Sequence, residues 1–205
     1  MKNIFIIATL MTSVFMPVNI ALSQQYNSDG IYVGLDGSYD QIRDNIKATP
    51  DNIYNANGTA FGIFVGYRGS QDKFTVAVEA RYGYSFISND IITTNPTQRY
   101  SITHEFGGAI MPGFWLSEQA LIYAKVGFNQ STQIKTLQDI EFKSSNSGIS
   151  LGGGIQLYAT DTVAIRAEYE RSNLKGIVPI VYNASTYNDW KVRRNRFRVA
   201  LITAF

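Results

Sequence analysis

Polar and apolar residues alternate with a period of two along most of the chain from Gly30 onward. In the first run, Ile31 and Val33 share one face of an extended segment, and Tyr32 and Gly34 share the other. Successive side chains of a β-strand point to opposite sides of the sheet, so this pattern predicts strands with two unlike faces. No segment sustains the period of about 3.6 residues that an amphipathic helix requires. The alternation recurs in eight runs, at residues 31–39, 61–68, 74–84, 100–110, 122–129, 149–157, 163–170 and 196–205.

The lengths of these runs and of their connections favour a barrel. Each run is close to the ~9–11 residues of a tilted strand that crosses a membrane. Short connections lie at residues 69–72, 113–118 and 160–161. Long polar connections, rich in Asn, Ser and Thr, lie at residues 40–58, 87–97, 130–145 and 173–192. Short turns on one rim and long loops on the other are typical of outer-membrane barrels. We therefore expect an all-β protein: an eight-stranded antiparallel up-and-down transmembrane β-barrel with both chain ends on the short-turn rim.

The first residues have the pattern of a secretory signal. Lys2 is followed by an apolar run that continues to about Met16, and Pro17 breaks it. Residues 21–23, Ala-Leu-Ser, fit the small-residue cleavage rule. The alternative, a membrane anchor helix, is disfavoured because the apolar run is shorter than the ~20 residues that a spanning helix needs. We expect a signal peptide at residues 1–23 and a barrel domain at residues 24–205, which would make the mature protein an exported one.

Composition excludes several classes of function. The formal net charge is +2, from 18 Lys and Arg against 16 Asp and Glu, so nothing in it favours binding to nucleic acid. The chain has no cysteine, which excludes a disulfide framework, a thiolate zinc site and a thiol nucleophile. A single histidine leaves little for a histidine-based metal cluster. We expect neither a cofactor nor a metal ion.

The polar face of the predicted strands carries charges in mid-strand. Six basic and four acidic residues share this face by parity: Arg68, Glu79, Arg81, Glu105, Lys125, Arg166, Glu168, Glu170, Arg196 and Arg198. The lumen of an eight-stranded barrel is just wide enough for side chains to fill it, so ions there must pair. We expect Glu79 to pair with Lys125 or Arg81. We also expect Glu168 or Glu170 to pair with Arg196 or Arg198.

Two barrels of opposite sense fit the same alternation. A membrane barrel turns the apolar face to lipid and the charged face inward, whereas a soluble lipocalin-like barrel turns the apolar face inward. Export and the glycine-rich charged face favour the membrane barrel. The alternation alone does not determine which face points inward. Tyrosine suits a membrane interface, because its ring is apolar and its hydroxyl stays in water. Tyrosines fall near five predicted strand ends, at Tyr39, Tyr67, Tyr84, Tyr100 and Tyr169.

Three stretches resemble the small outer-membrane β-barrel family, which includes OmpA-like barrel domains and alphaproteobacterial surface antigens. They are Ile31–Gly34 (IYVG), Pro112–Leu116 (PGFWL) followed by Leu121–Gly127 (LIYAKVG), and Arg166–Tyr169 (RAEY). The resemblance implies a location in the outer membrane of a Gram-negative cell. It also implies contact with outer-membrane lipid and lipopolysaccharide, and a host ligand that would bind through the loops.

The C-terminus resembles the signal that the barrel-assembly machinery reads in this family. It consists of Phe197, Val199, Leu201 and the terminal Phe205 at alternate positions. Thr203 stands where the family usually has a bulky apolar residue. The resemblance makes that machinery an expected partner.

Two further groups are candidate sites. Barrel enzymes that modify lipid A pair a histidine with a serine, but His104 has Thr103 and Glu105 beside it and falls on the apolar face. We therefore expect His104 to face lipid without chemistry. A basic cluster at the start of the last strand could meet lipopolysaccharide phosphates or form a solvated rim. It contains Lys191, Arg193, Arg194, Arg196 and Arg198.

The expected function is passive. We expect a surface-exposed structural or interaction protein, similar to a surface antigen or an adhesin, whose lumen is plugged by side chains. Function would then reside on loops held by a rigid scaffold. The alternatives are a narrow, porin-like pore and, less favoured, a lipid A-modifying enzyme.

Overall fold

The computed structural model describes residues 29–46, 52–91, 98–137, 140–176, 181–182, 185–186 and 190–205. The expected signal peptide at residues 1–23 lies outside this part of the chain. Eight long strands dominate: β1 (Gly30–Ile46), β2 (Asn52–Gln71), β3 (Phe74–Ile91), β4 (Gln98–Ser117), β5 (Ala120–Leu137), β6 (Ile140–Tyr158), β7 (Val163–Gly176) and β10 (Trp190–Ala204). Two short strands, β8 (Val181–Tyr182) and β9 (Ser185–Thr186), pair only with each other.

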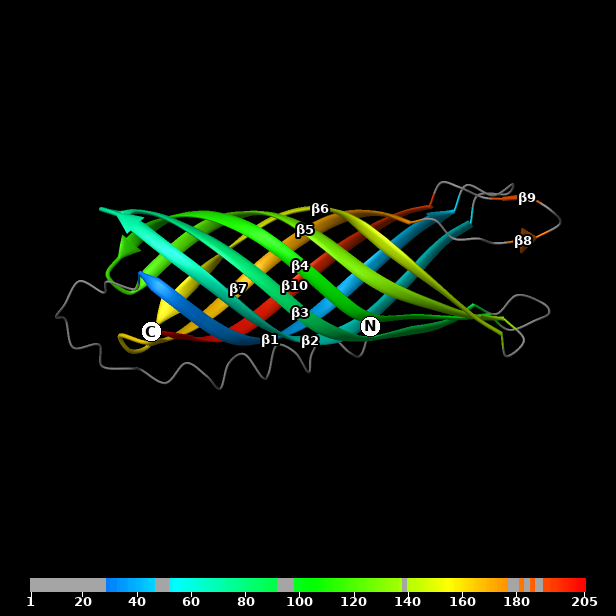
Figure 1. The fold of residues 1–205 in the computed structure, drawn as a ribbon, viewed down its shortest axis with the longest axis horizontal. Helices are drawn as coiled ribbons and strands as arrows, with labels where there is room; N and C mark the ends of the chain where they lie inside the picture. Colours follow the sequence, from blue (N-terminus) through cyan, green and yellow to red (C-terminus); the bar gives the residue numbers. More distant parts are fainter. Residues whose placement is uncertain are drawn as a thin grey trace, which may run out of the picture.

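The eight long strands form one closed antiparallel barrel (Figure 1). Each strand pairs with the preceding long strand in the chain, and β1 closes the barrel against β10. The expectation of an eight-stranded up-and-down barrel is confirmed. A search of the described residues for a helix long and apolar enough to cross a membrane found none.

One end of the barrel has tight turns, as expected. Asp72 and Lys73 connect β2 to β3, and Asp72 has a positive φ of 54°. Glu118 and Gln119 connect β4 to β5, and residues 159–162 connect β6 to β7. The last residue also lies at this end, where the Phe205 amide donates a hydrogen bond to the Ile31 carbonyl (2.9 Å; Figure 1).

The other end differs from the expectation of long loops. The barrel strands have 14 to 20 residues, so much of each predicted loop is strand. The β1–β2 ladder continues from Asp40 opposite Gly58 to Ile46 opposite Asn52. Hydrophobic alternation does not reveal such extensions, because a hydrogen-bonded ladder continues where both faces are polar and the apolar face has ended.

The extended strands separate into two sheets at this end. The β2–β3 ladder stops at the pair Ala60 and Ser85, and the β6–β7 ladder stops at Asn146 and Gly176. One sheet therefore contains the ends of β7, β10, β1 and β2, and the other contains the ends of β3, β4, β5 and β6. Figure 1 shows the two groups of strands diverging at the right.

The barrel is apolar outside and polar inside. Large hydrophobic side chains cover the outer wall, and Val126 is 52% exposed there. The wall is flanked by tyrosines, of which Tyr67, Tyr84 and Tyr169 are exposed, whereas the side chain of Tyr100 lies outside the described part. Only a bilayer gives such a surface an apolar environment, so the structure selects the membrane barrel over the lipocalin-like one.

One residue of the fourth run lies on the opposite face from the one predicted. Parity places Ile102 outside with His104, but Ile102 is buried in the interior and only 1% exposed. A register shift against β5 between Ile102 and Glu105 accounts for this, because the bulge inserts residues that reverse the alternation.

Candidate functional site in the barrel interior

The barrel interior contains a layer of ionisable side chains. All ten residues of the predicted charged face are buried in it. Three more, Asp36, Asp40 and Arg194, are buried with them. The layer thus holds seven basic and six acidic groups, contributed by β1, β2, β3, β4, β5, β7 and β10. We call these thirteen residues the charged layer.

Glu105 on β4 is the centre of the first group in the charged layer. Its carboxylate accepts hydrogen bonds from Arg196 (2.6 Å), Arg81 (3.4 Å) and Arg194. Arg196 also makes a two-bond pair with Asp40, with both distances 2.6 Å. Paired planar bonds of this kind fix orientation as well as adding energy. Glu105 therefore links β4 to β3 and β10, and the Arg196–Asp40 pair extends the group to β1.

Arg81 extends this group toward β1. Its Nε and Nη2 donate to the two carboxylate oxygens of Asp36, at 2.8 and 2.6 Å. A Cβ on Gly62 would lie 2.4 Å from Nη2 of Arg81. The guanidinium therefore occupies space that exists only because the facing residue of β2 is glycine.

Glu168 and Glu170 on β7 form the second group. Lys125 lies 2.9 Å from Glu168 and 3.2 Å from Glu170, and Arg198 pairs with both carboxylates. Nε of Arg198 also lies 3.5 Å from Asp36, which joins this group to the first. Of the two expected cations, Arg198 pairs with these carboxylates, whereas Arg196 pairs with Asp40 and Glu105.

The third group lies nearest the short-turn end. Glu79 pairs with Arg166 at 2.6 Å, not with the expected Lys125 or Arg81. Gln156 accepts hydrogen bonds from Arg166 and from Arg68 (3.0 Å). The Arg166 guanidinium also lies over the ring of Phe64, 5.0 Å from its centroid. Parity could not supply the Glu79–Arg166 pair, because the two residues are 87 positions apart and meet only across the closed lumen.

Two apolar layers lie above and below the charged layer. Along β10 the inward residues read, in order, Val192, Arg194, Arg196, Arg198, Ala200 and Ile202. The layer at the short-turn end is rich in aromatic rings and includes Tyr32, Phe64, Met111, Trp115, Leu121 and Tyr158. The layer at the long-strand end consists of Ile42, Ala56, Ile87, Ile102, Leu174 and Val192. Most of the ions are therefore enclosed along the barrel axis as well as by its wall, whereas Arg68 lies within the aromatic layer and donates a hydrogen bond to Tyr158.

The charged layer includes residues that sequence reasoning missed. Asp36 and Asp40 have the inward parity of β1, and Arg194 has that of Arg196 and Arg198, so parity alone could have found all three. The predicted basic cluster is corrected accordingly. Arg194, Arg196 and Arg198 lie inside, Arg193 is exposed outside, and the side chain of Lys191 lies outside the described part.

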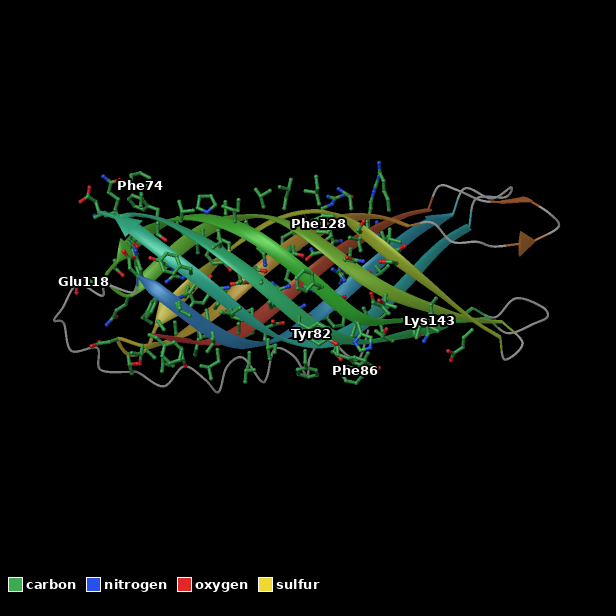
Figure 2. All side chains as sticks on the ribbon, in the orientation of Figure 1. Phe74, Tyr82, Phe86, Glu118, Phe128 and Lys143 are labelled. Carbon is green, nitrogen blue, oxygen red and sulfur yellow. The ribbon has the colours of Figure 1, made fainter. Side chains whose placement is uncertain are left out.

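His104 lies on the outer wall. Its Nδ1 is 2.7 Å from the hydroxyl of Tyr82, and its ring stacks against Tyr82 at a centroid distance of 6.1 Å. Figure 2 shows Tyr82 and Phe86 pointing away from the barrel. Among the described residues, no group of three or more His, Asp or Glu side chains is placed to hold a metal ion.

The residues of the C-terminal signal form part of the same outer wall. Phe197, Val199, Leu201 and Phe205 are all exposed, whereas Thr203 is half-buried. They form the outward face of the strand that closes the barrel against β1.

The chain is similar to several solved structures. Neisserial surface protein A is 15% identical, with 86% of this chain and 97% of that chain covered and a TM-score of 0.56. Ail, the attachment invasion locus protein of Yersinia pestis, is 15% identical over 85% and 99% of the chains, with a TM-score of 0.48. OprG of Pseudomonas aeruginosa is 11% identical over 89% and 99%, with a TM-score of 0.49. A comparison with curated protein sequences found no match.

The family assignment comes from the sequence itself. The profile of the family described as "Outer membrane protein beta-barrel domain" matches residues 6–202, which is nearly the whole chain. Its outer wall, closed barrel and short-turn rim are those of a protein that resides in the outer membrane of a Gram-negative cell. The chain belongs to the outer membrane protein β-barrel family.

Proposed function

We propose that this protein is a surface-exposed interaction protein, similar to a surface antigen or an adhesin, whose lumen is plugged. The barrel anchors it, and the hairpins at the long-strand end present a binding surface outside the cell. The observation that carries the proposal is the contrast between a side-chain-filled interior and strands that continue well past the apolar wall.

The filled interior supports a passive barrel rather than a pore. An ion that crossed the lumen would have to pass both apolar layers and break paired charges between them. The layer at the short-turn end includes Trp115 and Tyr158, with ring centroids 5.5 Å apart. Unpaired ions in a low-dielectric interior are costly, so the charged layer resists rearrangement.

The projecting strands support a role in binding. Beyond the apolar wall, the described strands continue as hydrogen-bonded ladder, which holds this part of each hairpin in a fixed conformation. Rigid presentation lowers the entropic cost of binding a partner. Figure 2 shows Lys143, on β6, near the far end of one projecting sheet, whereas Glu118 lies at the opposite, short-turn end.

The test shortens each hairpin at a register pair. Four register pairs serve, one for each hairpin: Arg43 and Asn55, Ile87 and Ile102, Thr132 and Ser145, and Gly176 and Trp190. Joining each pair by an Asn-Gly turn removes a hairpin tip while keeping the ladder below it. The matched control, D72N/K73G, places the same dipeptide in the tight turn between β2 and β3 on the short-turn rim.

Cells that display each variant are then compared for attachment to immobilised matrix glycoproteins and to epithelial monolayers. Cells that display the native protein should attach better than cells without it. At least one shortened-hairpin variant should lose this difference, and the D72N/K73G control should keep it. Heat-modifiable migration on gels shows that every barrel has folded. Equal attachment by all folded variants would contradict the proposal.

Planar bilayers test the pore alternative. Native protein should give no discrete conductance. Discrete conductance steps whose size changes in Glu79→Ala or Arg198→Ala would show that the lumen is a narrow pore and is not plugged. For the enzyme alternative, we expect unchanged lipid A mass spectra on overexpression of native protein and of His104→Ala.

Two further proposals concern export and assembly. We propose that residues 1–23 are removed, which N-terminal sequencing of the outer-membrane form should show as a start at Gln24. We also propose that the barrel-assembly machinery reads Phe197, Val199, Leu201 and Phe205. Deleting Phe205 should reduce the folded protein in the outer membrane, and Thr203→Leu should not.

A further inference from the structure

The outer surface above the apolar wall carries a one-sided group of cations. Arg43 on β1, Arg171 and Lys175 on β7 and Arg193 on β10 are all exposed and alternate with inward residues of the same strands. These three strands are neighbours in the barrel, with β10 in the middle. We call these four residues the cationic surface.

Two of these arginines directly oppose each other. Arg43 and Arg193 are register partners on adjacent strands, and Asn173 separates Arg171 from Lys175 on the other side of Arg193. Side chains at opposed positions of an antiparallel pair lie about 4.5–5.5 Å apart at Cβ, and like charges placed so are destabilising. Within the described residues, none of the four cations makes an ion pair. A bound anion would remove the repulsion.

The cationic surface joins the apolar wall directly. Immediately below it, the ring of Tyr169 packs against Phe197 in a tilted arrangement, at a centroid distance of 4.9 Å, and its hydroxyl donates a hydrogen bond to Asn195 (3.0 Å). An apolar ring with a satisfied hydroxyl marks the level where hydrocarbon meets the polar headgroups. The cations therefore lie at headgroup height.

A pocket of about 450 Å³ connects the two environments. It lies over β6 and β7, and its lining combines Ile149 and Leu151 with Arg171 and Lys175. Ile149 and Leu151 belong to the apolar wall and are 64% and 61% exposed. A ligand that fits this lining has an acyl chain at one end and an anionic group at the other.

On the opposite side of the barrel, the part of the chain that the structure describes shows no such combination. At the same height, the described outward residues of β3, β4 and β5 include Phe86, His104 and Gln130. Figure 2 shows Phe86 and Phe128 projecting from the wall on this part of the barrel. Among the described residues at this height, the outward-facing cations lie on β1, β7 and β10, and Lys143 on β6 lies farther out. This one-sided arrangement favours a localised binding site over a general attraction to an anionic membrane surface.

We propose that the cationic surface and the adjoining pocket bind the phosphate groups and one acyl chain of a phosphorylated glycolipid in the outer leaflet. Arginine pairs well with phosphate because its planar donors form two parallel charge-assisted bonds. A lipid phosphate between Arg43 and Arg193 would turn their repulsion into shared attraction. The inference rests on the orientation in the proposed function, with the long strands outside the cell.

Native mass spectrometry of the refolded barrel in detergent measures the effect. The probes are bisphosphorylated lipid A, lipid A without phosphate, and inorganic phosphate. Native protein should bind bisphosphorylated lipid A in preference to the dephosphorylated form. The variant R171Q/R193Q should weaken this binding about tenfold or more, since each charge-assisted bond contributes at least about 1.4 kcal/mol. R171K/R193K, which keeps the charge, should lose less.

The matched control, K73Q/K143Q, removes two exposed cations from other parts of the barrel. It should bind bisphosphorylated lipid A as native protein does. An equal loss of binding in K73Q/K143Q and R171Q/R193Q would show that only net charge matters, which would overturn the proposal. If millimolar inorganic phosphate displaced lipid A, the site would be one for free phosphate, and the proposal of a glycolipid ligand would be overturned. Attachment of cells to host surfaces depends on the hairpin tips, so R171Q/R193Q should leave it intact. Failure of this inference and failure of the proposed function are therefore distinguishable.

Discussion

The charged layer and the apolar layer at the long-strand end occupy the same lumen and have the same inward parity, yet they are stabilised in different ways. Each residue of the apolar layer, such as Leu174, is stabilised by its own removal from water. A residue of the charged layer, such as Glu105, is stable only while its partners are present, since burial of the ion alone is unfavourable. The comparison teaches that the interior combines independent contacts with a mutually dependent set, and mutations should separate the two.

Removing one charge from the centre of the charged layer should have the largest effect. Glu105→Gln leaves Arg81, Arg194 and Arg196 with less negative charge to balance them, so we expect a loss of about 3–5 kcal/mol in the free energy of unfolding. Urea unfolding in lipid vesicles, followed by tryptophan fluorescence, measures it. Glu118→Gln in an exposed turn is the control and should change the free energy by less than about 0.5 kcal/mol. A loss below about 1 kcal/mol for Glu105→Gln would mean that water already reaches this layer.

Moving a charge by one residue, from the inside to the outside of β5, should have the next largest effect. Lys125 is stable because it lies between Glu168 and Glu170. Val126→Lys places the same side chain in hydrocarbon without a partner, at a cost of about 2–4 kcal/mol near the bilayer midplane. Gln130→Lys, on the same outward face but above the wall, should cost about 0–1 kcal/mol. Equal costs at the two positions would show that the membrane covers both or neither.

The apolar layer should respond in small, additive steps. Ile102→Val removes one methylene group from a fully buried site and should cost about 0.5–1.5 kcal/mol. Ile202→Val, in the apolar layer at the short-turn end, should cost a similar amount. The charged layer separates it from Ile102, so the double variant should lose close to the sum, measured by the same unfolding assay. A strongly non-additive result would place these residues in a coupled set like the charged layer.

Replacing both members of a pair should have the smallest effect. Glu79→Met and Arg166→Met each leave a buried ion without its partner. Together they replace a buried pair by apolar volume, which is often neutral or stabilising, so the double variant should lie within about 1 kcal/mol of native protein. The interaction energy from the double-mutant cycle checks this. If the double variant lost as much as the two single variants combined, the two residues would contribute independently of each other.

Much of the interior was predictable from the sequence. The period of two placed Arg68, Glu79 and Lys125 on one face, and the same rule applied to β1 and β10 would have added Asp36 and Arg194. The short turns at Asp72 and Glu118 were predictable from the brief polar gaps between apolar runs. The rule did not work at Ile102, where a bulge reverses the alternation, or in the polar strand extensions, where no apolar face signals a ladder.

The sequence by itself determined which residues share a face, because the two-residue period is a property of any extended chain. It did not determine which face is inside, since a membrane barrel and a lipocalin-like barrel satisfy the same pattern. Tertiary structure decided this by closing β1 against β10, which brings Asp40 within 2.6 Å of Arg196, 156 positions away. Only a closed lumen brings Glu79 and Glu105 to cations on distant strands, Arg166 on β7 and Arg194 on β10. With the ions paired inside, the apolar face is left to lipid.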